Sequence, residues 1–379
     1  MVPLAALLGL FCASVASATP SAEVGALHAA TALASDDECA AGDAACALNA
    51  LQLKREAVRV LGQPVARRAI LVDWKSFDQA ADRAITRDQY SPGYVLQMTL
   101  GGDLISLEVI QTKGGLIQAF KLNGNSIVLN RPWPNQMDGS QFWPSPQSAW
   151  GWPPPAAIDP VPSKHFEMAY SAQVDEARSS VTLTSPKATS LGIQIRKSFS
   201  LRPAIGAVAL RYEIFNAGKE PKSFAPWEIT RVPPGGLSFF MTGGEPSSGS
   251  FRSLHLAKAA GATWFQQDPS AGGGGKLYAS TAGGWLAQAS GELILVKCFR
   301  KVPAEATAPG EGQIELYDGG DYLEMEVQGA YMSIPPGGTL TWQMLWYLRR
   351  FPAGRLEREK LVAFAEGLCS KAPVADDSS

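Results

Sequence analysis

From Gly93 onward the chain consists of short segments in which apolar and polar residues alternate, and this two-residue period most constrains its fold. About a dozen such segments, from YVLQMTL to TLTWQMLWYL, are separated by turn sequences such as GGD, NGN, NAGKEP and PPGG. Successive strand residues point to opposite faces, so each segment offers one face to a core and one to solvent. The pattern predicts a large, mainly antiparallel β-sandwich.

Segments of different composition flank the predicted sandwich. An Ala-rich region contains CALNALQLKREAVRVL, whose apolar residues recur at helical spacing and predict a short N-terminal helical segment. Near the other end, AGRLEREKLVAFAEGLCSK has the apolar spacing of an amphipathic helix that packs on the sandwich. The predicted order is a signal peptide, the Ala-rich segment, the sandwich domain, the C-terminal helix and a disordered tail, over residues 1–18, 19–66, 67–352, 353–371 and 372–379.

The N-terminus has the pattern of an export signal. MVPLAALLGLFCASVASA joins an uninterrupted apolar run to Ala16-Ser17-Ala18, which a signal peptidase can cut before Thr19, although no Lys or Arg precedes the run. The run from Leu4 to Val15 is too short to span a bilayer, and no later run approaches the ~20 apolar residues needed. We expect a secreted or secretory-pathway protein without a membrane span.

Cysteine usage is compatible with that compartment. Removing the signal leaves Cys39, Cys46, Cys298 and Cys369, an even number. Cys39 and Cys46 in ECAAGDAAC can close a small loop, and no neighbouring His or Cys completes a metal shell around them. Cys298, in the apolar segment LILVKCF, is interpreted as a buried thiol.

Charge and motifs exclude several classes of function. A net charge of -2 and a pI near 6.0 argue against nucleic acid as a partner, because nucleic acid requires a basic surface. The sequence contains no GxSxG, HExxH or GxxxxGK[ST] motif and no Rossmann glycine pattern after a strand. We expect no cofactor and no metal, and the sequence makes no prediction of oligomeric state.

The stretch from Trp133 to Trp152 holds four of the ten tryptophans in a proline-rich sequence. Its prolines fix φ and restrict the residues before them, which predicts a stiff loop. Two interpretations remain open. The rings either plug the open face of a sheet or present indole surfaces to the apolar face of a sugar.

A set of motifs, taken in order, resembles a known superfamily. KGGLIQAFKLNGNSIVL, the tryptophan-proline loop, LGIQIRKSFSL, VALRYEIFNAGKEPKSFAPWEITRVPPGG and YLEMEVQGAYMSIPPGGTLTWQMLWYL resemble the galactose mutarotase-like (aldose 1-epimerase-like) β-supersandwich. The chain is more closely similar to an uncharacterised-domain family within that superfamily. The resemblance covers about residues 90–350 and implies a sugar held by aromatic and carboxylate side chains on the concave face of the larger sheet.

The resemblance also implies a proton-transfer chemistry. Mutarotases use a carboxylate base on the anomeric hydroxyl and a histidine acid on the ring oxygen. Glu326 in LEMEVQ matches the base, and Glu324 shares its strand face. The catalytic histidine pair has no clear counterpart among His28, His165 and His255, and His165 in PSKHFEM is the one candidate for the acid.

Glu228 in PWEITRVPPGG is the second carboxylate candidate. Strict alternation places Glu228 on the strand face opposite Trp227 and Arg231, so a Glu228–Arg231 contact requires a bend or bulge. The alternative interpretation of Glu228 is a structural ion pair at the end of a strand.

These observations give three interpretations of function. The favoured one is a secreted carbohydrate-binding protein, because the histidine pair is missing. The others are an active carbohydrate enzyme, such as an aldose 1-epimerase-like isomerase with Glu326 as base, and a structural sandwich without ligand. The catalytic candidates are Glu326, Glu228 and His165, and the predicted ligand-binding residues are Trp143, Trp150, Trp152, Trp227, Arg231, Arg196, Arg211 and Glu324.

Overall fold

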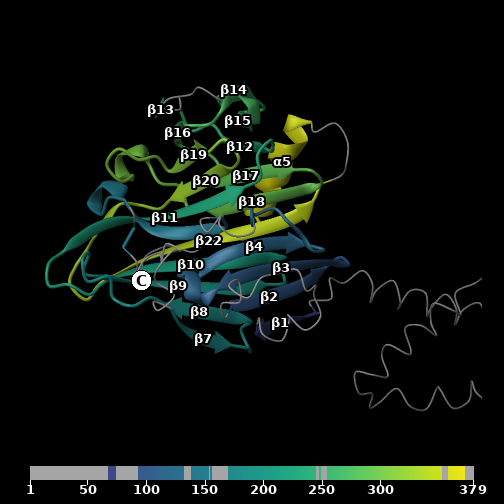
Figure 1. Ribbon diagram of the computed structural model, residues 1–379. Helices are drawn as coiled ribbons and strands as arrows, with labels where there is room; N and C mark the ends of the chain where they lie inside the picture. The colour runs from purple at the N-terminus through teal and green to yellow at the C-terminus, as the bar shows by residue number, and fades with distance from the viewer. Residues whose placement is uncertain are drawn as a thin grey trace, which may run out of the picture. The chain divides into compact units, whose positions relative to one another are not determined.

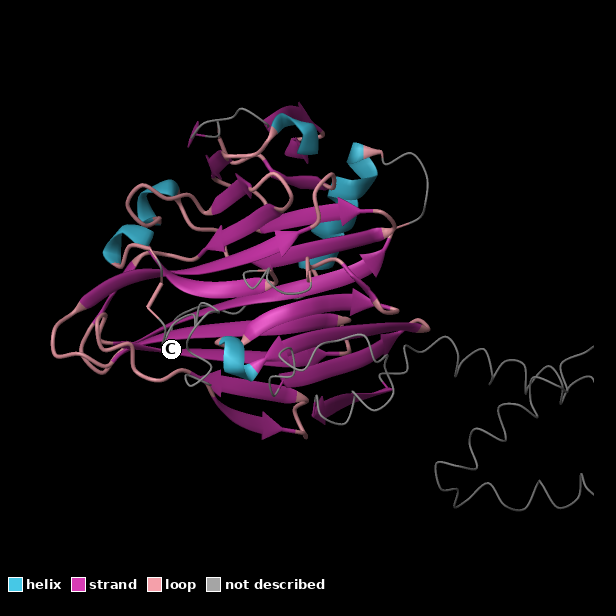
Figure 2. Cartoon of the chain, viewed as in Figure 1, coloured by secondary structure: helices cyan, strands magenta, loops and turns pink. Residues whose placement is uncertain are grey.

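Two large antiparallel β-sheets face each other and one helix packs on the outside of the second sheet in the computed structural model (Figure 1, Figure 2). The mainly antiparallel β-sandwich expected from alternation and the C-terminal helix expected from helical spacing are both confirmed. The predicted signal peptide, N-terminal helical segment, Cys39–Cys46 loop and tail lie outside the described residues. The structure describes residues 67–73, 93–131, 138–152, 154–155, 170–244, 247–248, 254–351 and 357–371, all within the unit Ala66–Ser379.

In the larger sheet, strands from the middle of the chain lie between strands from its N-terminal and C-terminal parts. Its spatial order is β1 (Arg67–Asp73), β2 (Gly93–Leu100), β3 (Asp103–Ile110), β4 (Leu116–Leu122), β6 (Ser140–Ser145), β11 (Lys222–Val232), β20 (Leu323–Gln328), β19 (Ile314–Asp318), β16 (Gly275–Ala279) and β13 (Ser247–Ser248). Two short strands pair off this path, β5 (Asn125–Ser126) with β4 and β21 (Met332–Ile334) with β11.

The second sheet has ten strands. Its order is β14 (Leu254–Ala259), β15 (Ala262–Gln267), β12 (Leu237–Met241), β17 (Trp285–Ser290), β18 (Leu293–Phe299), β22 (Thr339–Arg350), β10 (Ala207–Asn216), β9 (Ile193–Arg202), β8 (Ser180–Thr184) and β7 (Ser171–Asp175). The described 3₁₀ turns are η2 (Gln111–Lys113), η3 (Gln147–Ala149), η4 (Pro269–Ala271) and η5 (Ala304–Ala306).

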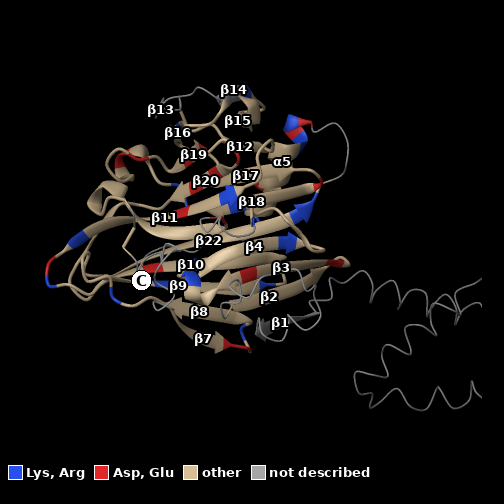
Figure 3. Ribbon diagram, viewed as in Figure 1, with Lys and Arg blue, Asp and Glu red and all other residues tan. Residues whose placement is uncertain are grey.

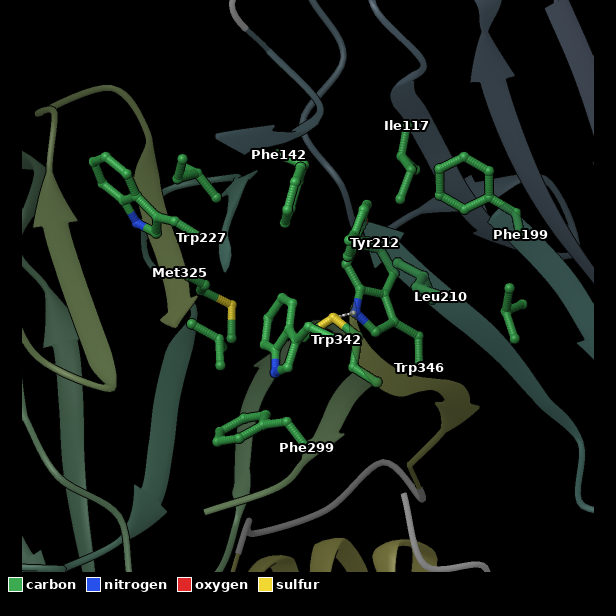
Figure 4. Packing of buried hydrophobic residues seen from close by; sticks show 14 of the residues in the cluster. Ile117, Phe142, Phe199, Leu210, Tyr212, Trp227, Phe299, Met325, Trp342 and Trp346 are labelled. Carbon is green, nitrogen blue, oxygen red and sulfur yellow. Dashed lines mark hydrogen bonds between the residues drawn. The ribbon is translucent and has the colours of Figure 1, made fainter. Parts of the chain in front are cut away.

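The space between the sheets is filled by large rings. Phe142 of the larger sheet stacks on Tyr212 of the second sheet with ring centroids 4.2 Å apart, and the ring centroid of Trp342 lies 6.0 Å from that of Tyr212 (Figure 4). These three side chains are at most 2% exposed. Burying rings of this size between two sheets contributes a large share of the apolar stabilisation.

A buried ion pair joins the two sheets inside this core. Lys297 of β18 lies 2.7 Å from Glu228 of β11, and both side chains are 0% exposed. Lys297 also donates to Thr230 Oγ1 at 2.7 Å and to the Met325 carbonyl at 3.1 Å, so its three ammonium protons all have acceptors. Burial lowers the pKa of Lys297, while the charge of Glu228 opposes that shift. Glu228 is therefore part of the core, paired with Lys297 rather than with Arg231.

Part of the predicted tryptophan-proline loop is a strand. Residues 140–145 form β6, which pairs along β11 with Trp143 opposite Trp227 and Pro144 opposite Pro226. The carbonyl of Pro144 accepts from Trp150 Nε1 at 2.7 Å, and that of Pro226 accepts from Gly329 N at 2.9 Å. The backbone groups of both prolines therefore point away from the β6–β11 ladder. Their missing N–H groups cost no hydrogen bond between these two strands.

Gly139 starts this strand in a conformation that needs glycine. Its φ is +102°, and an added Cβ would lie 2.5 Å from the Ile117 carbonyl oxygen of β4. The close approach fixes β6 against β4.

The C-terminal helix α5 (Arg358–Cys369) covers part of the second sheet's outer face. Its buried residues Leu361, Val362, Ala365 and Leu368 pack with Trp264, Trp285 and Ala287. The sequence pattern did not predict β15 and β17, because neither segment alternates clearly between apolar and polar residues. Both faces of these strands are buried, one by the core and the other by α5. None of the described helices is long and apolar enough to cross a membrane.

A disulfide ties this helix to the sheet. Cys298 of β18 bonds Cys369 at the end of α5; their Cα atoms are 5.5 Å apart, and the two cysteines are separated by 71 positions in sequence. Cys298 is therefore not the free buried thiol expected from its apolar strand.

We expect Lys297→Met to lower the free energy of unfolding by about 3–5 kcal/mol, because Glu228 would keep a buried charge without a cation to neutralise it. The double variant Glu228→Gln/Lys297→Met should recover most of that loss. Urea denaturation of the two single variants and the double variant tests the pair, and simple additivity of the losses would contradict it.

Removing the disulfide should loosen α5. Cys369→Ala is expected to lower the unfolding free energy by about 2–4 kcal/mol under oxidising conditions. The variant and the wild type should unfold alike in a strong reductant, which serves as the matched control. An equal gap between them with and without reductant would show that the lost side-chain packing, not the cross-link, is responsible.

Candidate functional site

The outer face of the larger sheet carries polar and aromatic residues on adjacent central strands. Glu326 of β20 lies opposite Glu315 of β19 and Ile229 of β11, and Glu315 lies opposite Tyr278 of β16. Because alternate residues share a face, these side chains point away from the Glu228–Lys297 pair. We call Trp143, Trp227, Lys276, Glu315 and Glu326 the outer-face cluster.

Lys276 lies at the centre of this cluster. Its Nζ is 2.6 Å from Glu315 Oε2 and 3.1 Å from Glu326 Oε2. The same ammonium lies 5.2 Å from the ring centroid of Trp227 and 5.4 Å from that of Tyr278. Burial lowers the pKa of Lys276, but the charges of Glu326 and Glu315 outweigh it and leave the pKa above its ordinary value. Lys276 therefore stays protonated near neutral pH.

Glu326 is buried and only partly satisfied. Its Oε2 accepts from Trp227 Nε1 at 2.9 Å and from Lys276, and the residue is 1% exposed. Its Oε1 has no hydrogen-bond partner among the described residues. A buried carboxylate oxygen without a donor is costly, so Glu326 Oε1 is an unsatisfied acceptor within the outer-face cluster.

Glu315 is held in place by its neighbours. Its Oε1 accepts from Gln328 Nε2 at 2.7 Å and from Gly312 N at 3.1 Å. Burial and then the nearby Glu326 charge raise the pKa of Glu315 well above its usual range, against the lowering effect of Lys276.

A second ion pair joins β11 and β20 next to the outer-face cluster. Arg231 Nε donates to Glu324 Oε1 at 2.9 Å, and the guanidinium lies 4.0 Å from the ring centroid of Tyr322. Burial and then the Glu326 charge raise the pKa of Glu324 to about 7, although Arg231 lowers it. A carboxyl group with this pKa changes its charge near neutrality.

Three further charged residues extend this pair. Asp138 receives two hydrogen bonds from the Arg131 guanidinium, at 2.8 and 2.9 Å, and lies 3.9 Å from Arg231. Arg131 also pairs with Asp321. Figure 3 shows charged positions on β11 and β20, two neighbouring strands of this sheet.

The tryptophans of the β6 region meet at the cluster's edge. The Trp143 ring contacts Trp150, Trp152 and Trp227 edge-on, with centroids 5.7, 6.0 and 5.5 Å apart. Trp143 and Trp227 are buried, whereas Trp152 is 61% exposed. The plug interpretation therefore holds for Trp143, whereas the ring of Trp152 is exposed to solvent.

The structure brings most of the predicted site residues together. Trp143, Trp150, Trp152, Trp227, Arg231, Glu324 and Glu326 lie on or beside the outer face of the larger sheet. His165 lies outside the described residues. For His255, the described backbone lies in β14, at the edge of the second sheet.

Three predicted residues lie elsewhere and correct the sequence interpretation. Glu228 points into the core, where Lys297 neutralises it. Arg196 and Arg211 share Glu213, at 3.3 and 3.0 Å, on the second sheet. On their strands the alternate residues Ile195 and Tyr212 face the core, so the two arginines face outward on the far side of the sandwich. They cannot contribute to a site on the larger sheet.

Sequence reasoning missed Lys276 and Glu315. One local signal could have identified Lys276: alternation in the segment GKLYA places Lys276 and Tyr278 on the same strand face. Their proximity to Glu326 depends on the order β20-β19-β16, which no local pattern contains. Among the residues that the structure describes, no group of three or more His, Cys, Asp or Glu is arranged to hold a metal ion.

A family model described as a domain of unknown function, DUF4380, matches residues 134–349, more than half of the chain. The chain belongs to the DUF4380 family. The matched part of this DUF4380 protein contains every member of the outer-face cluster, and it fits the expected similarity to an uncharacterised family. No curated protein shows a significant sequence match.

Many solved structures similar to this DUF4380 protein are galactose mutarotase-like or aldose 1-epimerase-like, as the sequence motifs indicated. A galactose mutarotase-like protein from Lactobacillus casei is 9% identical with a TM-score of 0.45, and the match covers 65% of this chain and 97% of that one. A galactose mutarotase related enzyme from Lactobacillus acidophilus is 8% identical with a TM-score of 0.45, covering 66% and 96%.

A TPR-domain containing protein from Parabacteroides distasonis is 14% identical, with a TM-score of 0.45 and coverage of 70% of this chain. The DUF4380 chain spans 50% of the length of that protein. These likenesses concern the fold alone.

The raised pKa of Glu324 predicts a pH dependence of stability. Because folding raises this pKa from its ordinary value of 4.5 to about 7, Glu324 favours the folded state at low pH, and that contribution is lost as pH rises from about 4.5 to about 7. Urea denaturation over this range should show a shallower decline for Glu324→Gln than for wild type. The control Glu176→Gln, at the exposed β7–β8 turn, should parallel wild type. Parallel curves for all three proteins would contradict the assignment.

Proposed function

We propose that this protein binds carbohydrate on the outer face of its larger sheet. The observation that carries the proposal is the continuous path from the exposed Trp152 ring through Trp143 to Trp227, whose indole N–H is donated to Glu326. An apolar ring beside a fixed carboxylate suits a sugar, which combines a C–H face with hydroxyl donors.

The polar groups beside Trp152 have the chemistry that hydroxyl groups need. Glu326 Oε1 is an acceptor without a described donor, and the half-buried Lys276 is a donor held between two rings. Trp227 and Gln328 fix Glu326 and Glu315 by hydrogen bonds, so their carboxylates are ordered before any ligand arrives. Such preorganisation reduces the entropy lost on binding.

The protonation of Lys276 and its contact with Glu326 favour binding over catalysis. An epimerase needs a proton donor and a free base. Lys276 holds its proton too tightly to act as an acid at neutral pH, and it occupies one oxygen of Glu326. The Cys298–Cys369 disulfide supports placing the protein in an oxidising compartment, in line with the predicted export signal.

Trp152→Ala should weaken sugar binding by about 1 kcal/mol, roughly fivefold, without loss of stability, because the ring is mostly exposed. Glu326→Gln should weaken it further, by about 1.5–3 kcal/mol, because the hydrogen bonds to a charged acceptor are lost. Val174→Ala, an exposed apolar residue on edge strand β7, is the matched control and should bind like wild type.

A glycan array followed by calorimetry measures these effects. An array on which the folded wild type binds no sugar would overturn the proposed function. Polarimetry of freshly dissolved α-glucose and α-galactose tests catalysis in parallel. Acceleration by wild type that disappears in Glu326→Gln would replace binding with epimerase activity.

A further inference from the structure

We propose that the site selects saccharides by charge, favouring those with free amino groups over neutral ones and rejecting uronic acids. This inference rests on the proposed function, because it concerns the ligand of the same surface. Its basis is the balance of charges around the outer-face cluster and one unsatisfied acceptor inside it.

Carboxyl groups outnumber cations in the two adjoining groups of ion pairs. Five acidic side chains, Asp138, Asp321, Glu324, Glu326 and Glu315, lie among three cations, Arg131, Arg231 and Lys276. Near neutral pH the raised pKa values of Glu324 and Glu315 keep part of these groups protonated, so the negative excess is smaller than two charges. Glu311 adds to this excess, since its charge also acts on Glu315. A partly desolvated surface with this balance attracts cations and repels anions.

The cations of the network are committed to carboxylates at short range. Lys276 lies between Glu315 and Glu326, at 2.6 and 3.1 Å, and Arg231 is 2.9 Å from Glu324. Arg131 is held by two oxygens of Asp138. A uronic acid would have to displace one of these carboxylates to gain a cation, and it would leave that carboxylate unpaired.

Two features would instead receive an ammonium group. Glu326 Oε1 is buried, lies beside the exposed tryptophan path and has no partner among the described residues. A charge-assisted N–H donor binds a carboxylate more strongly than a sugar hydroxyl does. The exposed ring of Trp152 adds a surface for cation–π contact with an amino group.

The test compares three oligosaccharides of equal length, made of glucosamine, N-acetylglucosamine and a uronic acid. The first two differ only in the acetyl group that removes the amine's charge. Isothermal titration calorimetry of the full chain at neutral pH and low salt should give about tenfold tighter binding of the glucosamine oligomer than of its acetylated form. The preference should shrink as salt is added, and the uronic acid oligomer should bind most weakly.

Two variants separate this charge selection from a general loss of binding. Asp321→Asn removes an exposed carboxylate of the network, and Glu324→Gln removes a half-buried one, so both should lower the ratio of glucosamine to N-acetylglucosamine affinity severalfold. Glu176→Gln makes the same change in net charge at the β7–β8 turn of the other sheet and should leave the ratio unchanged. Asp321 is exposed, so its variant keeps the test valid if Glu324→Gln does not fold.

The outcomes separate this inference from the proposed function. Equal affinity for the two glucosamine-based oligomers, tighter binding of the uronic acid, or an affinity ratio that Asp321→Asn leaves unchanged would overturn charge selection. Each of these results would leave carbohydrate binding intact. Failure of every sugar to bind the folded protein would overturn both.

Discussion

The alternation of side chains along β11 is the constraint on which both the core and the candidate site depend. Glu228 and Thr230 point between the sheets, where they meet Lys297, while Trp227 and Arg231 point outward to Glu326 and Glu324. The registers with β6 and β20 fix this arrangement from both sides. A slip of one residue would exchange the two faces, so the core ion pair and the candidate site depend on the same strand register.

The two lysine–glutamate clusters of the molecule show how similar residues serve different purposes. Inside the sandwich, Lys297 and Glu228 have all their hydrogen-bonding groups satisfied by protein atoms, as a buried pair must. On the outer face, one Lys276 serves two carboxylates, and Glu326 Oε1 has no partner among the described residues. The first cluster holds two sheets together, and the second leaves an acceptor unsatisfied, on which the proposed function rests.

The sequence was informative wherever one strand decided the answer. Alternation put Glu324 and Glu326 on one face, and Glu228 on the face opposite Trp227, as the structure has them. Sequence patterns did not predict the features that depend on a neighbouring strand. The prolines suggested a loop at residues 140–145, yet these residues form a strand paired with β11. The pairing is possible because the backbone groups of the prolines point away from the shared ladder. Arg196 and Arg211 have the right residue type for a sugar site but belong to the other sheet.

By itself, the sequence determined the local period of the strands, the amphipathic C-terminal helix and the supply of aromatic and acidic side chains, because these depend on residues within one element. Only the tertiary structure decided which elements became neighbours. Lys276 reaches Glu326 across 50 positions, Lys297 reaches Glu228 across 69, and Cys298 bonds Cys369 across 71. Such contacts follow from strand order and sheet packing, and the two-residue period is the same whichever strands lie side by side.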